Sequence, residues 1–220
     1  MVADGTPTRV RDGVRAALPL VLGPVLFGLS FGVLADAAGM SAAAAVVMSA
    51  TTFAGSAQFA AASVLADGGT VLAAVVSAVL LNLRYVGQSI AAASVFSGSR
   101  ARRFFESQLI VDESWALSGR SGRFEWPILV GAGLLLYVLW VSSTAVGSFV
   151  GGALGDPNDL GLDAAFAALF LALAMPYLRE RKAVEAAVVA GAITLVLIPV
   201  VPAGVPLVAA SAACLLGLRR

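Results

Sequence analysis

The chain has 220 residues, of which 60% are hydrophobic and only 12% are charged, and its mean hydropathy is +0.94. Soluble domains carry about 25% charged residues, so this composition excludes a water-soluble domain and indicates an integral membrane protein. The formal net charge of +1 gives no reason to expect a nucleic-acid partner. One cysteine and no histidine exclude a disulfide framework, and we expect neither a metal site nor a cofactor.

The amino-terminal segment is similar to a signal peptide but longer. Three arginines precede an apolar run over residues 16–35, and the run ends in the small-residue sequence Ala35-Asp36-Ala37. The apolar region of a signal peptide has about 7–15 residues, whereas this run has 20. We therefore expect an uncleaved first transmembrane helix after a cytoplasmic segment 1–15.

Apolar segments recur along the whole chain, separated by short polar or glycine- and proline-bearing breaks. They predict an all-α, polytopic membrane protein with about seven hydrophobic helices in a single membrane domain over residues 1–220. An eighth segment, 104–119, carries three acidic residues, so it must lie at the surface or be shielded from lipid by protein. The seven apolar segments are 16–35, 42–66, 70–96, 127–154, 164–178, 184–201 and 203–218.

Arginine clusters indicate which loops face the cytoplasm. The carboxyl half alternates as this rule requires, but three full crossings after a cytoplasmic amino end would place Arg100, Arg102 and Arg103 outside. We therefore expect segment 42–66 to be broken or re-entrant, because its centre, residues 53–59, is small and polar, as in elements that line a cavity. The alternative is that segment 104–119 crosses the membrane and leaves the arginine loop outside.

A weak similarity between two segments of the chain favours an internal repeat. The sequence Gly32-x-Leu34-x-Asp36 resembles Gly152-x-Leu154-x-Asp156, and an alanine-rich segment follows each. Internal repeats are common in secondary transporters. Ordinary membrane loops share this composition, so both readings remain open.

Arg84 follows Asn82 inside the otherwise uncharged segment 70–96. An arginine at the bilayer centre costs about 2.5–3.5 kcal/mol on insertion scales, so it indicates a functional site. A guanidinium can hold a carboxylate in a bidentate manner, and Ser77, Arg84 and Gln88 share one helical face. The alternative is that Arg84 pairs with a buried acidic residue and only joins helices.

Two other regions are candidates for the same site. In the 53–59 break, Gly55, Ser56 and Gln58 predict a cavity wall, with backbone groups exposed to substrate if the helix unwinds at Gly55; close helix packing is the alternative. Small hydroxyl residues form a helical stripe there, namely Ser49, Thr52, Ser56 and Ser63.

Asp112 and Glu113 are adjacent, so on a helix they point about 100° apart and only one is expected to serve the site. Glu113 aligns with Glu106 and is expected to reach water. Asp112 is favoured as the inward carboxylate, able to neutralise Arg84, contact an ammonium group or carry a proton. The alternative is a helix cap or a surface ion pair with a following arginine. Asp112 aligns with an apolar stripe of Phe105, Leu109 and Ala116.

These motifs resemble the AzlC family of branched-chain amino-acid permeases along roughly residues 13–218. The resemblance implies an exporter of branched-chain amino acids such as valine that works with a small companion membrane subunit of the AzlD type. Tyr85 stands where many relatives have histidine, which argues against proton coupling through that position. The matching motifs are Leu18-Pro19, residues 27–32, residues 53–59, Asn82-Leu83-Arg84, Asp112-Glu113-Ser114, Gly161-Leu162-Asp163 and Pro176.

We therefore expect a multi-pass carrier in the cell membrane that exports branched-chain amino acids by alternating access. A channel would need rings of like charge, and the chain has no histidine and therefore no HExxH motif for an intramembrane enzyme. A structural or regulatory membrane subunit, or a carrier of another small solute, remains the alternative. The expected substrate site comprises Gly55, Ser56, Gln58, Asn82, Arg84 and Asp112.

Overall fold

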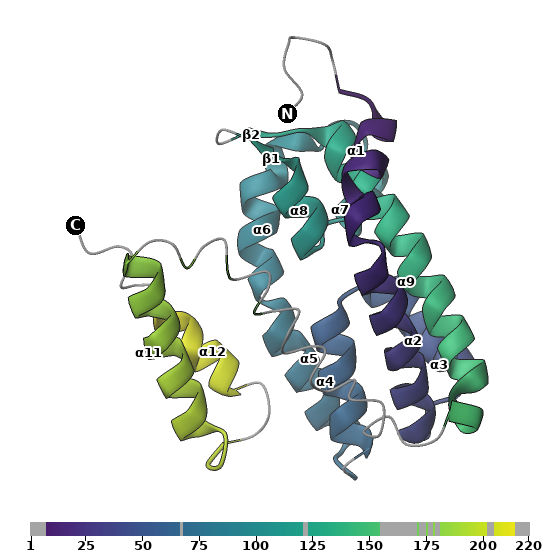
Figure 1. Cartoon of the computed structure of the whole chain (residues 1–220), viewed down its shortest axis with the longest axis vertical. Coiled ribbons are helices and arrows are strands. Elements are labelled where there is room, and N and C mark those ends of the chain that lie inside the picture. The colour runs from purple at the N-terminus through teal and green to yellow at the C-terminus, as the bar shows by residue number, and fades with distance from the viewer. Residues whose placement is uncertain are drawn as a thin grey trace.

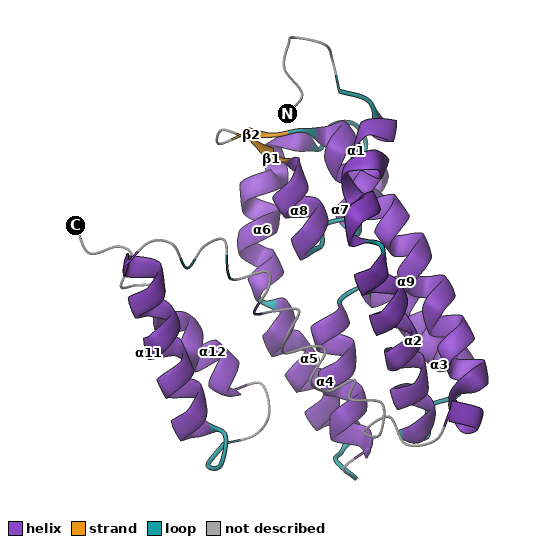
Figure 2. Ribbon diagram, in the orientation of Figure 1, coloured by secondary structure: helices purple, strands orange, loops and turns teal. Residues whose placement is uncertain are grey.

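The structure is a computed structural model that describes residues 8–66, 68–120, 123–154, 171, 175, 178, 181–201 and 205–213. These residues are mostly helical (Figures 1 and 2), which confirms the all-α prediction. The helices are α1 (Val10–Ala17), η1 (Leu18–Leu20), α2 (Leu22–Ala37), α3 (Ala42–Thr52), α4 (Gly55–Ala66), α5 (Val71–Asn82), α6 (Arg84–Ala92), η2 (Ala93–Val95), α7 (Arg100–Ser107), α8 (Asp112–Ser118), α9 (Trp126–Leu154), α11 (Arg181–Leu197) and α12 (Val205–Ser211). Two short strands, β1 (Gly119–Arg120) and β2 (Arg123–Phe124), pair antiparallel.

Among the described residues, two helices have the length and apolar character of membrane spans, Val71–Val95 and Trp126–Val150. A third span results if Val10–Leu20 and Leu22–Ala37, bent by 67°, cross together. The predicted count of seven is not confirmed. The described segments 42–66 and 184–201 do not have the character of full spans, segment 164–178 lies almost entirely outside the described residues, and segment 203–218 lies partly outside them. The second half of the predicted repeat also extends beyond them.

Helix α9, with 29 residues, is the longest helix in the described part of the chain, and α1 and α2 pack along it (Figure 1). Glycines allow this close approach. A Cβ on Gly32 would collide with the Thr144 carbonyl oxygen, and a Cβ on Gly147 with that of Leu29. The two backbones therefore approach one another through positions where only glycine fits.

Segment 42–66 has the predicted break, between α3 and α4. Phe53 adopts a left-handed conformation, with φ of 41°, and Ala54 is not helical. Helix α4 then returns beside α5, since Ala54 and Ala57 pack with Leu81. Both outer ends of the pair lie at the end of the molecule where α2 ends (Figure 1), so the segment forms a hairpin and does not cross.

This hairpin resolves the conflict over the arginine clusters. Helices α5 and α6 return the chain to the end where α1 begins, and α7 and the β1–β2 hairpin also lie there (Figure 1). The arginines of α1, of α7 and of the strands therefore share one end of the molecule, as the positive-inside rule requires.

Segment 104–119 is not one helix, and the alternative that it crosses is wrong. Helix α7 ends at Ser107 and α8 begins at Asp112. Ile110 packs with Ala92 and Leu129, so the chain enters the helical bundle between the two helices. The β1–β2 hairpin that follows α8 lies at the end where α7 lies (Figure 1).

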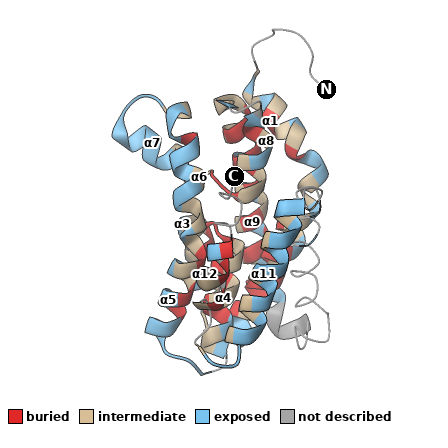
Figure 3. Cartoon of the chain, turned by 90° about the vertical axis from the view of Figure 1, so that its left-hand side faces the viewer, coloured by how far each residue is buried: buried red, intermediate tan, exposed pale blue. Residues whose placement is uncertain are grey.

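Buried residues concentrate where α2, α3, α4 and α9 meet, whereas α5, α7 and α11 expose much of their surface (Figure 3). The main core cluster contains Phe27, Phe31, Phe53, Leu136 and Trp140. The helix interruptions border this core.

Candidate functional site

A cavity of about 60 Å³ lies where the helix interruptions converge. The first turn of α2, the α3–α4 break, the start of α6, the start of α8 and the middle of α9 all contribute side chains. The cavity therefore collects polar groups from segments far apart in the sequence. Its lining residues are Gly23, Pro24, Phe27, Phe53, Gly55, Ser56, Arg84, Tyr85, Val111, Asp112, Glu113, Leu136 and Trp140.

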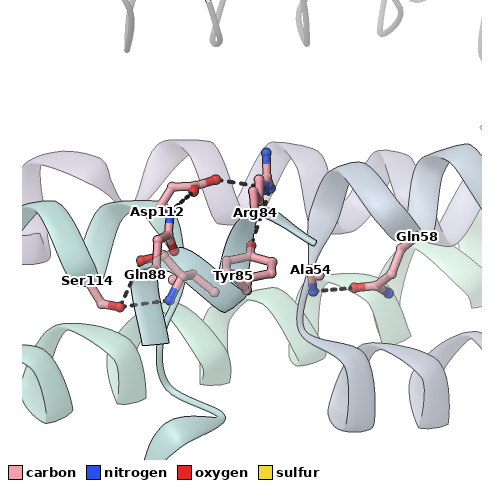
Figure 4. A network of polar contacts seen from close by, with 8 residues as sticks. Ala54, Gln58, Arg84, Tyr85, Gln88, Asp112 and Ser114 are labelled. Atoms are coloured by element: carbon pink, nitrogen blue, oxygen red, sulfur yellow. Dashed lines mark hydrogen bonds and ion pairs between the residues drawn. The ribbon is translucent and has the colours of Figure 1, made fainter. Parts of the chain in front are cut away.

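Arg84 and Asp112 form an ion pair in this cavity (Figure 4). Arg84 Nη2 lies 3.0 Å from Asp112 Oδ2, and the two side chains are 30% and 28% exposed. Gln88 Nε2 donates to Asp112 Oδ1 at 2.7 Å, and Trp115 Nε1 donates to the Gln88 carbonyl at 3.2 Å. The carboxylate is thus held by two side chains one helical turn apart.

Arg84 lies near the middle of the Val71–Val95 span. Leu83 interrupts regular hydrogen bonding between α5 and α6 but keeps helical dihedral angles, φ −55° and ψ −26°. The faces predicted for one continuous helix are therefore preserved, which explains why Arg84 and Gln88 both reach Asp112. Arg84 Nη2 also donates to the Tyr85 hydroxyl at 3.3 Å.

Asp112 faces Arg84 for a reason other than the predicted stripe. Phe105 is 70% exposed and Ala116 is also exposed, so no buried apolar stripe runs through this segment. Instead, the turn through Ile110 and Val111, both 6% exposed, places the start of α8 in the cavity. The predicted stripe is wrong because the helix that it requires is interrupted at residues 108–111.

Glu113 also lines the cavity and is only half-buried. Glu113 therefore borders the same cavity as Asp112, and the preference for Asp112 as the acid that serves the site stays a prediction. Both acids lie in the first turn of α8, where side chains on either side of a helix end can border the same space. The cavity contains two carboxyl groups and one guanidinium.

Gln58 lies outside the cavity lining and holds the α3–α4 break together (Figure 4). Its Oε1 accepts hydrogen bonds from the Ala54 N–H at 3.2 Å and from Trp140 Nε1 at 3.1 Å. Its Nε2 donates to Ser49 Oγ at 2.8 Å, which in turn contacts Thr144 Oγ1 at 2.9 Å. Gln58 is fully buried, and its geometry does not support the predicted role in binding substrate.

Gly55 and Ser56 do line the cavity, at the start of α4. A Cβ on Gly55 would lie 2.8 Å from the Trp140 ring, so glycine is needed there. Ser56 Oγ is buried and has no hydrogen-bond partner among the described residues. The hydroxyl and the positive end of the α4 dipole are therefore available to a bound group.

Asn82 is two residues before Arg84 in the sequence, but it does not line the cavity. Its Oδ1 is buried without a hydrogen-bond partner among the described residues. The predicted hydroxyl stripe of residues 49–63 is also divided by the break at Phe53.

The sequence prediction missed the site role of Trp140, for which the available signal was an indole N–H in an apolar span.

Comparison with known proteins gives the chain its family. Residues 19–154 match the family described as AzlC protein. A membrane protein of Archaeoglobus fulgidus without an assigned function is 33% identical over 84% of this chain and 83% of its own length. A similarly named membrane protein of Helicobacter pylori is 25% identical over 75% of this chain and 74% of its own.

The branched-chain amino acid transport protein AzlC of Bacillus subtilis is 25% identical over 78% of this chain and 69% of its own length. No solved structure matches. The family match covers more than half of the chain and includes Arg84, Asp112 and the α3–α4 break. The chain therefore belongs to the AzlC family and is a multi-pass membrane protein.

Proposed function

We propose that this protein exports branched-chain amino acids such as valine across the cell membrane by alternating access. The observation that carries the proposal is the Arg84–Asp112 ion pair in a cavity bordered by helix ends. An amino acid presents a carboxylate and an ammonium group, and the two members of the pair have the matching charges. The name of the Bacillus subtilis relative points to the same substrate class.

The cavity walls suit the third part of such a substrate. Phe27, Phe53, Leu136 and Trp140 give it an apolar side, where a branched aliphatic side chain would be removed from water. Ser56, at the start of α4, lines the same cavity as Arg84 and adds a polar group to it. A zwitterion with an apolar side chain thus has a complementary group for each of its parts.

The size of the cavity supports a mechanism in which the ion pair opens. A volume of about 60 Å³ corresponds to about two water molecules, which is less than an amino acid needs. Binding would therefore separate Arg84 from Asp112, with the substrate carboxylate taking the place of Asp112 on Arg84 and the ammonium group turning to Asp112 or Glu113. Such exchange of partners avoids leaving either charge unpaired.

A small companion membrane subunit of the AzlD type is part of the proposal, on the basis of family membership alone. The experiment is counterflow of labelled valine into proteoliposomes that contain the full chain, with and without this subunit. Counterflow that unlabelled leucine and isoleucine inhibit, and that lysine does not, is the expected result. No flux of any amino acid in either preparation would exclude a carrier and favour a structural subunit, and flux of unrelated solutes alone would exclude the substrate class.

A further inference from the structure

Two arginines of α7 are not used in the ion pairs of the described residues. Arg102 Nε pairs with Glu106 Oε1 at 2.7 Å, and its guanidinium lies 5.4 Å from the centre of the Trp126 ring. Arg100 and Arg103 lie on another face of the helix, and no acidic side chain in the described part of the chain pairs with them. Both are exposed.

These two arginines border a groove of about 330 Å³. On α7, Arg100, Arg103, Phe104 and Ser107 follow one helical stripe at spacings of three, four and seven. Facing them are residues from the end of the preceding span, and buried Ile110 closes the groove. The facing residues are Ser89, Ala93 and Phe96.

The groove extends from the last turns of the Val71–Val95 span to the arginines of α7. Ser89 lies in the Val71–Val95 span, about 9 Å from its end at a rise of 1.5 Å per residue. Gly98, with φ of 96°, allows the sharp turn before α7, and Ser99 caps that helix by accepting from the Arg102 N–H at 3.3 Å. The arginines thereby lie beyond the end of the span, above an apolar floor.

We propose that this groove binds an anionic phospholipid, with the phosphate-bearing headgroup on Arg100 and Arg103 and an acyl chain along Ala93, Phe96 and Phe104. The two unpaired positive charges favour an anion at the membrane surface. The apolar floor favours a ligand that carries a hydrocarbon chain, which a free phosphate lacks. The position of the groove at the end of a span matches the orientation of a phospholipid in a leaflet.

The test is binding of phosphatidylglycerol to the purified, delipidated full chain in neutral detergent, measured by native mass spectrometry and by the rise in melting temperature. Phosphatidylcholine and soluble glycerol 3-phosphate are the comparison ligands. We expect the double variant Arg100→Gln/Arg103→Gln to bind phosphatidylglycerol about 30-fold more weakly than the wild type. If the double variant does not fold, each single variant should bind about fivefold more weakly.

Two matched controls separate a built groove from general attraction to positive charge. Arg11→Gln/Arg15→Gln removes the same charge from α1, where both arginines lie beside Asp12, and should bind as the wild type does. Phe104→Ser should weaken binding, whereas Phe105→Ser should not, because only Phe104 lines the groove. Equal loss in both arginine pairs, undiminished binding by Arg100→Gln/Arg103→Gln, or competition by glycerol 3-phosphate as strong as by the lipid would overturn the proposal.

Discussion

Arg84 Nη2 and Asp112 Oδ2 lie 3.0 Å apart across the cavity, and Gln88 holds the second oxygen of the same carboxylate. The pair joins the middle of a membrane span to the first residue of α8. Since the guanidinium and the carboxylate are each costly to leave unpaired in an apolar environment, a change to one is also a change to the other.

Replacement of Arg84 distinguishes a substrate ligand from a purely structural residue. Arg84→Lys keeps the charge but loses the planar fork, so it should fold and lose most valine counterflow, about 10–100-fold. Arg84→Ala should lose transport and assemble poorly, because Asp112 is left without its partner. The double variant Arg84→Ala/Asp112→Asn should recover assembly but not transport. Normal counterflow in both Arg84→Lys and Arg84→Ala would reduce Arg84 to a structural role.

Asp112 and Glu113 should differ in effect although both line the cavity. Asp112→Asn removes the charge that faces Arg84, so it should impair export strongly. Glu113→Gln should be milder, since no ion pair to Glu113 occurs among the described residues. Initial rates of valine counterflow measure both, and the reverse ranking would assign the substrate ammonium to Glu113.

Replacement of Gln58 should lower the stability of the folded protein. Gln58→Leu leaves the Ala54 N–H and the Trp140 indole N–H without their acceptor and removes one of the two partners of Ser49, which keeps Thr144. This loss should lower the free energy of unfolding by about 2–5 kcal/mol, as measured by detergent-induced unfolding. Thr51→Ala is the matched control, because the Thr51 hydroxyl is exposed and bonds only within its own helix; a similar loss in both variants would contradict the role of Gln58 in the break.

Gly32 should be intolerant of any side chain. A Cβ there would collide with the Thr144 carbonyl oxygen and approach the Ser148 nitrogen within 2.5 Å. Gly32→Ala should therefore destabilise the protein by about 1–3 kcal/mol. Gly87→Ala, where nothing lies within 4 Å of the added atom, should be neutral or stabilising. Melting temperatures of the two variants in the same detergent provide the comparison.

The ion pair between Arg102 and Glu106 should make stability depend on pH. Burial raises the pKa of Glu106, but hydrogen bonds from Arg102 and Trp126 outweigh it, so the pKa lies below its ordinary value of 4.5. The stabilisation is therefore present above pH 4.5 and is lost as the pH falls through the lowered pKa. Arg102→Gln should melt below the wild type at neutral pH, and the two curves should converge in acid. A constant difference at all pH values would exclude this linkage.

The α3–α4 hairpin predicts which side of the membrane each end of the fold faces. In a Cys214→Ser background, a cysteine replacing Ser99 should resist an impermeant thiol reagent added outside intact cells, because α7 carries the arginine cluster. A cysteine replacing Asp36, in the last turn of α2, should react, because α2 ends at the opposite end of the molecule (Figure 1). Labelling at position 99 and protection at position 36 would invert the topology, and labelling at both would contradict the number of crossings.

The sequence alone was sufficient to predict a helical membrane protein, to single out Arg84 as a charge that is costly to place in a membrane span, and to predict the break in segment 42–66. These features are local, because a hydrophobic run, a buried charge and a small, polar interruption each have meaning within one segment. The resemblance to AzlC likewise depended on short motifs that stay together in the chain.

Only the tertiary structure decided which groups meet. A helical period predicts faces as long as the helix continues, so it related Arg84 correctly to Gln88 across Leu83 and failed for Asp112, whose expected stripe crosses an interruption at residues 108–111. Gln58 was expected in the cavity and Glu113 in water, and the structure places each differently. The Gln58 side chain bonds to Trp140 of α9, and Asp112 and Glu113 both border the cavity from the start of α8. These contacts join segments that are distant in sequence, so only packing determines them.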